Sequence, residues 1–215
     1  MSTSREGIKI IVRNFDKKST LDKAYKLVDQ YLAQDASGHD SAHIHRVVKL
    51  AFHLAKSVNQ EIDPFLLEIS ALLHDIEDPK LNNSGTNIVA NFLNDNHVPL
   101  HYQNSINDII SNLSYTATLK GKKQSVLEGK IVQDADRLDA LGAIGIARTF
   151  AYGGHKGRLM ASEKDLTSTI HHFSDKLLKL EDLMNTNEGK RLARLRTQYI
   201  KKYLRQFKIE EEISD

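Results

Sequence analysis

The apolar residues of this 215-residue chain recur mostly at three- and four-residue spacing, which is the period of an amphipathic helix. Alternating patterns typical of strands are short, and the best of them, residues 8–12, stands alone. The chain holds only three prolines, and no internal repeat is visible. The pattern therefore predicts an all-α protein with a single domain over residues 1–215. Its core is expected over about 20–150, with two C-terminal helices over about 165–208.

Capping residues indicate where the helices of the first half begin. Ser, Thr and Asp side chains can accept the free N–H groups of a first helical turn, and proline is tolerated there. The residues expected to begin helices are Ser19 or Thr20, Asp63 with Pro64, Thr86 and Pro99. The predicted helices then cover about residues 21–33, 42–58, 64–75, 87–93 and 99–113.

The second half contains a longer predicted helix and a glycine-rich segment. Ser125 and Glu128 have the spacing of a capping box, and the apolar pattern after them continues past Gly142. Residues 151–158 are basic and glycine-rich, which predicts a loop that could approach an anion. The last third is expected to form two long amphipathic helices, about 167–184 and 188–207.

Charge and hydropathy exclude several classes of protein. With 30 basic and 28 acidic residues the net charge is +2, so there is no strong case for nucleic acid as a partner. No apolar run approaches the roughly 20 residues that span a bilayer, so we expect no membrane association. Residues 1–9 lack the apolar segment of a signal peptide, and we expect a cytoplasmic protein.

A histidine and an aspartate side by side are the strongest chemical signal. His74 and Asp75 end the apolar run 65–73, His43 lies about one helix upstream, and Asp136 lies about sixty residues downstream. Two imidazoles and two carboxylates from three helices could hold one divalent cation and leave positions open for water and a phosphoryl oxygen. Since the chain has no cysteine, the ligands must be His and carboxylate, which favours Mn, Mg, Fe, Co or Ni over a zinc–thiolate site.

The motifs around these residues resemble those of the HD-domain metal-dependent phosphohydrolases. They are His39-Asp40-x-x-His43-x-x-Arg46, Leu73-His74-Asp75-Ile76 and Asp134-x-Asp136-Arg137-Leu138-Asp139. The similarity is greatest to the YedJ/YpgQ-like branch of that family, and it continues through residues 141–154, 172–173 and 176–186. Four spaced motifs in the same order make a chance match very improbable.

The resemblance implies an HD-domain helical bundle with a C-terminal helical hairpin packed on it. It implies metal ligation by His43, His74, Asp75 and Asp136. One divalent ion is expected, with Mn first and Mg, Co, Ni, Fe or Zn as alternatives. The implied activity is hydrolysis of a small-molecule nucleotide, in particular of a (deoxy)nucleoside triphosphate to monophosphate and pyrophosphate.

The ligand set itself leaves other functions open. A phosphodiesterase or a 5′-nucleotidase could use the same site, because the ligands suit any phosphate ester. A non-catalytic nucleotide-binding HD module is a third alternative. The sequence does not choose the base or the sugar, and a homo-oligomer is also left open.

Acids and cations near the motifs are candidates for catalysis and substrate binding. Asp78 lies three residues after Asp75 and could act as general base; Glu77, where relatives often carry a small residue, is the alternative. The candidate phosphate contacts are Lys80, Arg148, Lys156 and Arg158, with Arg137 also considered.

Other charged residues are expected to have supporting or surface roles. Arg46 is expected to partner a carboxylate, and Asp139 could orient a ligand because it shares a helix face with Asp136. Asp134 is expected at the surface or as a cap. His97 and His101 are expected to be surface or pocket-wall residues rather than ligands of a second metal.

Overall fold

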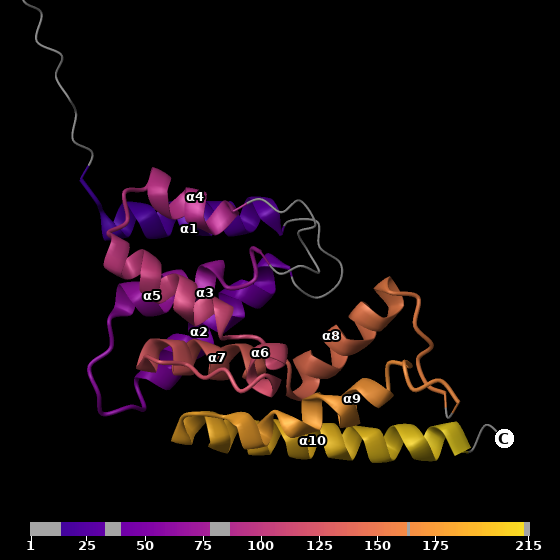
Figure 1. Ribbon diagram of the computed structural model, residues 1–215. Coiled ribbons are helices and arrows are strands. Elements are labelled where there is room, and N and C mark those ends of the chain that lie inside the picture. Colours follow the sequence, from indigo (N-terminus) through magenta and orange to yellow (C-terminus); the bar gives the residue numbers. More distant parts are fainter. Residues whose placement is uncertain (1–13, 33–39, 78–86, 163, 213–215) are drawn as a thin grey trace, which may run out of the picture.

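The computed structural model describes residues 14–32, 40–77, 87–162 and 164–212, and within these ranges it contains helices and no strand (Figure 1). The predicted all-α class is confirmed; the strand-like residues 8–12 lie outside the described ranges. The elements in order are α1 (Lys17–Tyr31), α2 (Ser41–Ala55), α3 (Pro64–Leu73), α4 (Ile88–Asp95), α5 (Leu100–Ser111), α6 (Tyr115–Leu119), α7 (Leu127–Asp139), α8 (Gly142–His155), α9 (His171–Asp175), the 3₁₀ turns η1 (Leu177–Lys179) and η2 (Glu181–Leu183), and α10 (Asn187–Glu212).

Side-chain caps define the starts of several helices. Asp63 accepts the backbone N–H groups of Phe65 (2.9 Å) and Leu66 (3.2 Å), so α3 begins as predicted. Helix α1 begins four residues earlier than expected, because Asp16 caps it instead of Ser19 or Thr20. The predicted cap Thr86 lies outside the described residues, and α6, which Ser114 caps, was not anticipated.

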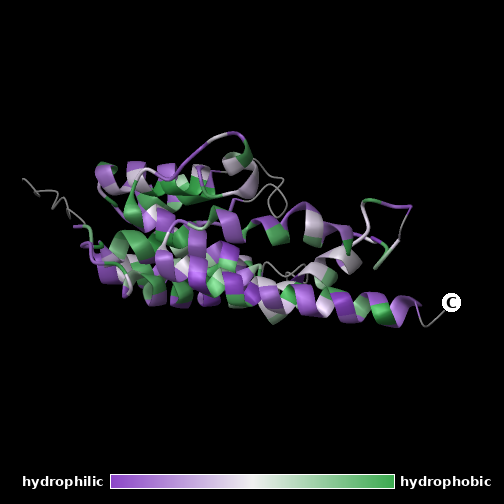
Figure 2. Ribbon diagram, turned by 90° about the horizontal axis from the view of Figure 1, so that it is seen from below, coloured by the Kyte–Doolittle hydropathy of each residue, from purple (hydrophilic) through white to green (hydrophobic). Residues whose placement is uncertain are grey.

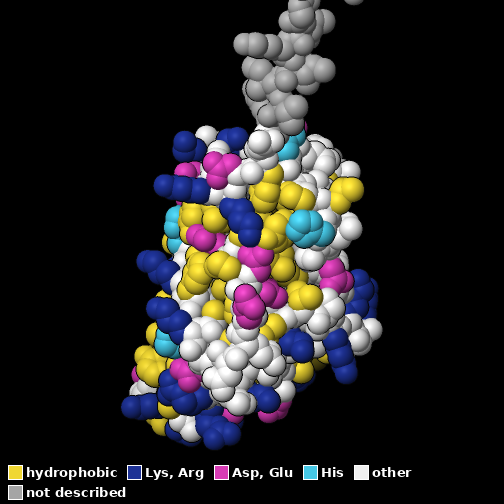
Figure 3. Space-filling model, turned by 90° about the vertical axis from the view of Figure 1, so that its left-hand side faces the viewer, with side chains coloured by type: hydrophobic (Ala, Val, Ile, Leu, Met, Phe, Trp, Pro, Cys, Tyr) yellow, Lys and Arg dark blue, Asp and Glu magenta, His cyan; other side chains and the backbone are white. Residues whose placement is uncertain are grey.

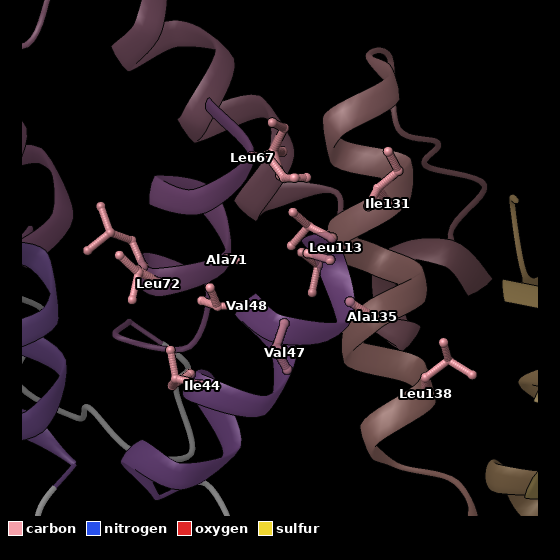
Figure 4. Close-up of a cluster of buried hydrophobic side chains, with 14 of the residues drawn as sticks. Ile44, Val47, Val48, Leu67, Ala71, Leu72, Leu113, Ile131, Ala135 and Leu138 are labelled. Atoms are coloured by element: carbon pink, nitrogen blue, oxygen red, sulfur yellow. The ribbon is translucent and has the colours of Figure 1, made fainter. Parts of the chain in front are cut away.

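The core lies between α2, α3 and α7, and α2 packs most extensively against α7 and α3. Figure 4 shows apolar side chains of the three helices pointing toward one another, among them Ile44 and Val47 of α2, Leu67 of α3 and Ile131 of α7. All four are 0% exposed. Burying an aliphatic side chain of this size contributes about 1.5–3 kcal/mol, so this apolar contact holds the three site-bearing helices together.

The predicted long helix is broken in two. Helix α7 ends at Asp139 and α8 begins at Gly142, whose φ of 75° lies in the left-handed region that favours glycine. The capping box is also wrong: Ser125 donates its hydroxyl to Asp108 (2.6 Å), and Glu128 accepts the backbone N–H of Asp63 (2.8 Å). The break turns α8 away from the bundle (Figure 1).

The C-terminal third is a long helix preceded by short turns. Helix α10 agrees with the predicted last helix, and in Figure 2 hydrophobic and hydrophilic positions alternate along it, as in an amphipathic helix. The expected helix 167–184 is replaced by α9, η1 and η2. The expected loop 151–158 is also wrong in part, since α8 continues to His155 and the chain turns at Gly157, where φ is 65°.

The surface carries both signs of charge. Figure 3 shows a face on which Lys and Arg side chains lie mainly around the edges, with hydrophobic and acidic groups between them. No helix in the described part of the chain is long and apolar enough to cross a membrane.

Candidate active site

Three helices bring the four predicted metal ligands together. His43 lies in the first turn of α2, where the Asp40 carboxylate accepts its backbone N–H at 2.8 Å. His74 directly follows α3 as its C-cap, Asp75 is the next residue, and Asp136 lies in α7. Both histidines and Asp75 are buried, whereas Asp136 is partly exposed. The predicted juxtaposition of these residues therefore exists in the fold.

The ligand atoms converge on one point. Nε2 of His43 lies 3.3 Å from Oδ2 of Asp75 and 3.5 Å from Oδ1 of Asp136. Nε2 of His74 lies 3.5 Å from Oδ1 of Asp75 and 3.8 Å from Oδ1 of Asp136. One atom each of His43, His74 and Asp136 lies within 4.8 Å of the other two. Ligands at about 2.1 Å from one ion are about 3–4 Å apart, so this spacing fits a single divalent cation.

Hydrogen bonds on the far side of both rings set their orientation. Nδ1 of His74 lies 2.8 Å from the carbonyl oxygen of Ala71, and Nδ1 of His43 lies 2.8 Å from Oδ2 of Asp139. Since each of these acceptors needs a proton on Nδ1, the neutral rings present an Nε2 lone pair to the site. Nε2 of His74 is buried and makes no hydrogen bond to any described residue, as expected of an atom that binds a metal.

The carboxylates and His74 shift each other's pKa values. Burial opposes the charged imidazolium of His74, but the charges of Asp75 and Asp136 outweigh burial and raise its pKa to about 9. Burial likewise opposes the carboxylate of Asp136, yet the close approach and the charge of His74 lower its pKa to about 2. A divalent cation would replace the proton on His74 and complete the neutralisation of the acids.

Two further aspartates on α7 are buried. Asp139 contacts His43 and accepts two hydrogen bonds from Arg46, from Nε at 2.7 Å and from Nη2 at 3.0 Å, as expected for both residues. Asp134 was expected at the surface or as a cap; it is 0% exposed, so the surface alternative is wrong. The capping alternative agrees with the structure, since Asp134 accepts the backbone N–H groups of Asn185 (2.8 Å) and Thr186 (2.7 Å) before α10.

Three of the four expected metal ligands, His74, Asp75 and Asp136, line a cavity of about 740 Å³. Arg148 and Arg158 line it, so two of the predicted substrate contacts share a cavity with the ligands. Glu77 lines it as well, and its Oε1 accepts the backbone N–H of Val89 at 2.8 Å. The predicted site residues in the cavity wall are His74, Asp75, Glu77, Asp136, Arg148 and Arg158.

One predicted substrate contact lies outside the cavity wall. Lys156 is exposed and does not line the cavity; its Nζ lies 5.7 Å from the centre of the Tyr152 ring. Because α8 extends to His155, Lys156 sits at the end of a helix rather than in a loop. Asp78 and Lys80 lie outside the described residues.

Sequence inspection missed several residues of the cavity wall. Lys176, His172, Tyr115 and Tyr152 all line it, and Nζ of Lys176 lies 5.6 Å from the centre of the Tyr115 ring. His172 and Lys176 fall in the segment that matched the YedJ/YpgQ-like branch, which was the signal available. His172 lies in the short helix α9 and Lys176 directly follows it, so neither lies in the continuous helix expected over 167–184.

Three other residues have structural or surface positions. His97 and His101 are exposed and do not line the cavity, in agreement with their expected surface position. The guanidinium of Arg137 donates to Thr118 Oγ1 (2.8 Å) and to the carbonyl oxygen of Leu183, so this buried cation ties α7 to α6 and η2.

Comparison with known proteins agrees with this geometry. The HD domain family matches residues 41–141. The protein YpgQ of Bacillus subtilis is 37% identical over 183 residues, which cover 83% of this chain and 87% of YpgQ. The crystal structure of YpgQ in complex with ADP matches with a TM-score of 0.74 and 34% identity, covering 90% of this chain and 96% of YpgQ.

Two other solved structures have the same fold. A Lactobacillus plantarum protein matches with a TM-score of 0.82 and 35% identity, covering 91% of this chain and 98% of that protein. An HD-superfamily hydrolase from Bacillus thuringiensis matches with a TM-score of 0.71 and 42% identity, covering 92% and 99%. With its helical bundle and its converging His and Asp ligands, this chain belongs to the HD domain family and is a metal-dependent hydrolase.

Proposed function

We propose that the protein hydrolyses (deoxy)nucleoside triphosphates to nucleoside monophosphate and pyrophosphate, with Mn²⁺ as the preferred metal. The observation that carries this proposal is one cavity, about 740 Å³ in volume, that is lined by three of the four expected metal ligands, His74, Asp75 and Asp136, and by four cations, Arg137, Arg148, Arg158 and Lys176. Its size is in the range of small-molecule sites. Relatedness to YpgQ, which was crystallised with ADP, also favours a nucleotide.

The metal ligands would be His43, His74, Asp75 and Asp136, whose donor set suits Mn²⁺. When bound, the cation supplies a water nucleophile at neutral pH and polarises a phosphoryl oxygen. The protein must orient the substrate and accept the proton of the attacking water. We assign proton transfer to Asp78, with Glu77 as the alternative.

The positions of the cations favour cleavage at the α-phosphorus. Arg148 and His43 both contact the carboxylate of Asp139, so this cation lies next to the expected metal site. Arg158 and Lys176 come from later parts of the chain and line the same cavity. Cations beyond the metal would stabilise the charge that develops on a pyrophosphate leaving group. Lys80 is an additional candidate for this contact, whereas Lys156 does not line the cavity.

Aromatic side chains suit the rest of a nucleotide. Tyr115 and Tyr152 line the cavity, and their rings provide flat surfaces against which a base can stack. Since stacking tolerates any base, the cavity supports the class of nucleotide rather than one member of it.

The direct test is hydrolysis in ¹⁸O-labelled water with Mn²⁺ and a panel of ribo- and deoxyribonucleotides. We expect the label in the monophosphate, because water attacks the α-phosphorus, and no free orthophosphate early in the reaction; label in the pyrophosphate would indicate attack at the β-phosphorus instead. Stepwise release of orthophosphate, or activity only on monophosphates, would instead indicate a 5′-nucleotidase. Binding of nucleotides with no turnover under any metal would indicate a non-catalytic module.

A further inference from the structure

Asp139 joins the metal site to the cavity through a single buried carboxylate. It ends α7, is 1% exposed and contacts side chains of α2 and α8. Its Oδ2 accepts from His43 Nδ1 at 2.8 Å, Arg46 Nη2 at 3.0 Å and Arg148 Nη1 at 2.9 Å. Its Oδ1 accepts from Arg46 Nε at 2.7 Å. A metal ligand and a cavity-lining cation therefore share one acceptor.

The donors around the carboxylate fix the tautomer of His43. Arg46 and Arg148 donate to the same carboxylate, and a guanidinium cannot accept a hydrogen bond, so Asp139 acts as the acceptor in each of these contacts. Asp139 accepts from His43 in the same way, so His43 carries its proton on Nδ1. The lone pair on Nε2 then faces Asp75 and Asp136, where a cation would bind.

The same carboxylate holds Arg148 in the cavity wall. Arg148 is half-buried and lines the cavity. Arg46 donates two hydrogen bonds to Asp139 and does not line the cavity. Two guanidinium groups around one carboxylate leave this cluster with a net positive charge. That excess favours an anionic group in the cavity, and a buried carboxylate limits the directions in which Arg148 can donate.

Asp134 shows that a buried acid on α7 does not necessarily contact a metal ligand. It is 0% exposed and accepts hydrogen bonds from the backbone and side chains of Asn185 and Thr186, which are neutral groups in the turn before α10. It contacts no metal ligand through the bonds described. Its role is to hold α10 in place, so it provides a matched comparison for Asp139.

We propose that Asp139 is a positioning residue with two effects: it fixes the orientation of the metal ligand His43 and it holds Arg148 ready to bind a substrate phosphate. Metal affinity and phosphate affinity therefore depend on one side chain. The Arg148 half of this inference rests on the proposed function, whereas the His43 half requires only that the site binds a metal.

The test measures binding rather than turnover. Isothermal titration gives the Kd for Mn²⁺ alone and, separately, the Kd for ADP without metal. Asp139→Asn keeps the shape of the side chain but removes its charge, and we expect Mn²⁺ affinity to fall by about 10- to 100-fold, as for other groups that orient a ligand. ADP affinity should fall as well. Arg148→Gln should weaken ADP binding and leave the Mn²⁺ Kd unchanged.

Two variants separate positioning from stability. Asp134→Asn should lower the melting temperature but leave the Mn²⁺ Kd at the wild-type value. Arg46→Gln removes the hydrogen bonds from Arg46 to Asp139 but leaves the contact between Asp139 and His43. This variant should therefore weaken Mn²⁺ binding less than Asp139→Asn and more than Asp134→Asn. If Asp139→Asn does not fold, the comparison of Arg46→Gln with Asp134→Asn decides the question.

Each result has a definite meaning. Unchanged Mn²⁺ affinity in both Asp139→Asn and Arg46→Gln would overturn the positioning of His43. Weakened Mn²⁺ binding with unchanged ADP binding in Asp139→Asn, or ADP that fails to bind wild type, would overturn the role of Arg148. If wild type binds Mn²⁺ but hydrolyses no nucleotide, the proposed function fails while the Mn²⁺ series still tests Asp139.

Discussion

Nε2 of His43 lies 3.5 Å from Oδ1 of Asp136, so the start of α2 and the last part of α7 meet at one ligand site. His74 from the end of α3 completes the trio. A cation bound there would add a link between three helices that already pack through apolar side chains. Metal binding should therefore increase the stability of the whole bundle.

Adding Mn²⁺ at about 100 times its Kd should stabilise the folded protein by about 2.7 kcal/mol. For a chain of this size that corresponds to a rise in Tm of roughly 5–10 °C. His74→Ala should abolish the rise and the bound metal while retaining helical circular dichroism. His101→Ala, at an exposed position, is the control and should behave as wild type. Full metal occupancy of His74→Ala by elemental analysis would contradict the site.

The two candidate bases can be separated by paired amide substitutions. Asp78→Asn should lower kcat by roughly 10²-fold or more with Mn²⁺ affinity nearly unchanged, because a general base contributes at least that much. Glu77→Gln retains an oxygen that can accept the N–H of Val89, so it should keep its structure and lose far less activity. A larger loss in Glu77→Gln than in Asp78→Asn would reverse the assignment.

Arg158 and Lys156 are neighbouring cations that differ in one respect, since only Arg158 lines the cavity. Arg158→Gln should raise KM for a nucleoside triphosphate by about 5-fold, the effect of losing an exposed ionic contact worth about 1 kcal/mol. Lys156→Gln should leave KM within twofold of wild type, in roughly the range expected of a surface change. Equal effects of the two substitutions would mean that net charge, rather than position, attracts the substrate.

The Asp63 carboxylate should make the stability of the folded protein depend on pH. Burial opposes its ionisation, but the Tyr102 hydroxyl, the N–H groups of Leu66 and Phe65 and the charge of Lys17 lower its pKa. Its charged form therefore adds stability above the unfolded pKa of about 3.9, and this stability is lost as the pH falls through the lower folded value.

Two substitutions of Asp63 test its cap and its charge. Asp63→Ala should cost about 1–2 kcal/mol at pH 7, because it removes the N-cap of α3. Asp63→Asn retains a cap and should cost less, and its difference from wild type should shrink below about pH 4. Urea unfolding across pH measures both, with the exposed Asp95→Asn as control. A difference between wild type and Asp63→Asn that is constant with pH would rule out the charge contribution.

Gly145 permits a close approach between α8 and the end of α7. A Cβ atom there would lie 2.2 Å from the carbonyl oxygen of Ala140, a backbone atom that cannot move alone. Gly145→Ala should therefore destabilise the protein by about 1–3 kcal/mol. Gly154→Ala, in the same helix with no atom within 4 Å of the new Cβ, should be neutral or slightly stabilising. Equal denaturation midpoints for the two variants would show that the α7–α8 contact relaxes freely.

Helix positions followed from the sequence where the apolar period agreed with a local cap. Asp63 and Pro64 gave the start of α3, and the spacing after residue 187 gave α10. The prediction failed where the apolar pattern of a helix continued through a position at which the helix itself ends. At Gly142 a left-handed φ ends the run, and residues 167–184 form a short helix and two 3₁₀ turns that bury Phe173 and Leu177 in the core.

The convergence of His43, His74 and Asp136 was predictable, because a His–Asp pair at the end of an apolar helix, with His43 and Asp136 at family spacing, is a strong local signal. The residues that line the cavity were not all predictable from the sequence. Lys176 reaches it because the chain turns after α9, and Lys156 misses it because α8 is longer than its glycines suggested. Asp134 and Asp139 look alike in the sequence, yet one anchors α10 and the other contacts His43 and Arg148.

The sequence by itself determined the helical class, the approximate core and the chemical types that meet at the metal site, because these follow from hydrophobic period and from local motifs. Only the tertiary structure decided which cations share a cavity with the ligands, and that one buried carboxylate serves both His43 and Arg148. Those relationships depend on the angle between α7 and α8. That angle is set by a backbone break and by packing between residues distant in the chain, which no local pattern records.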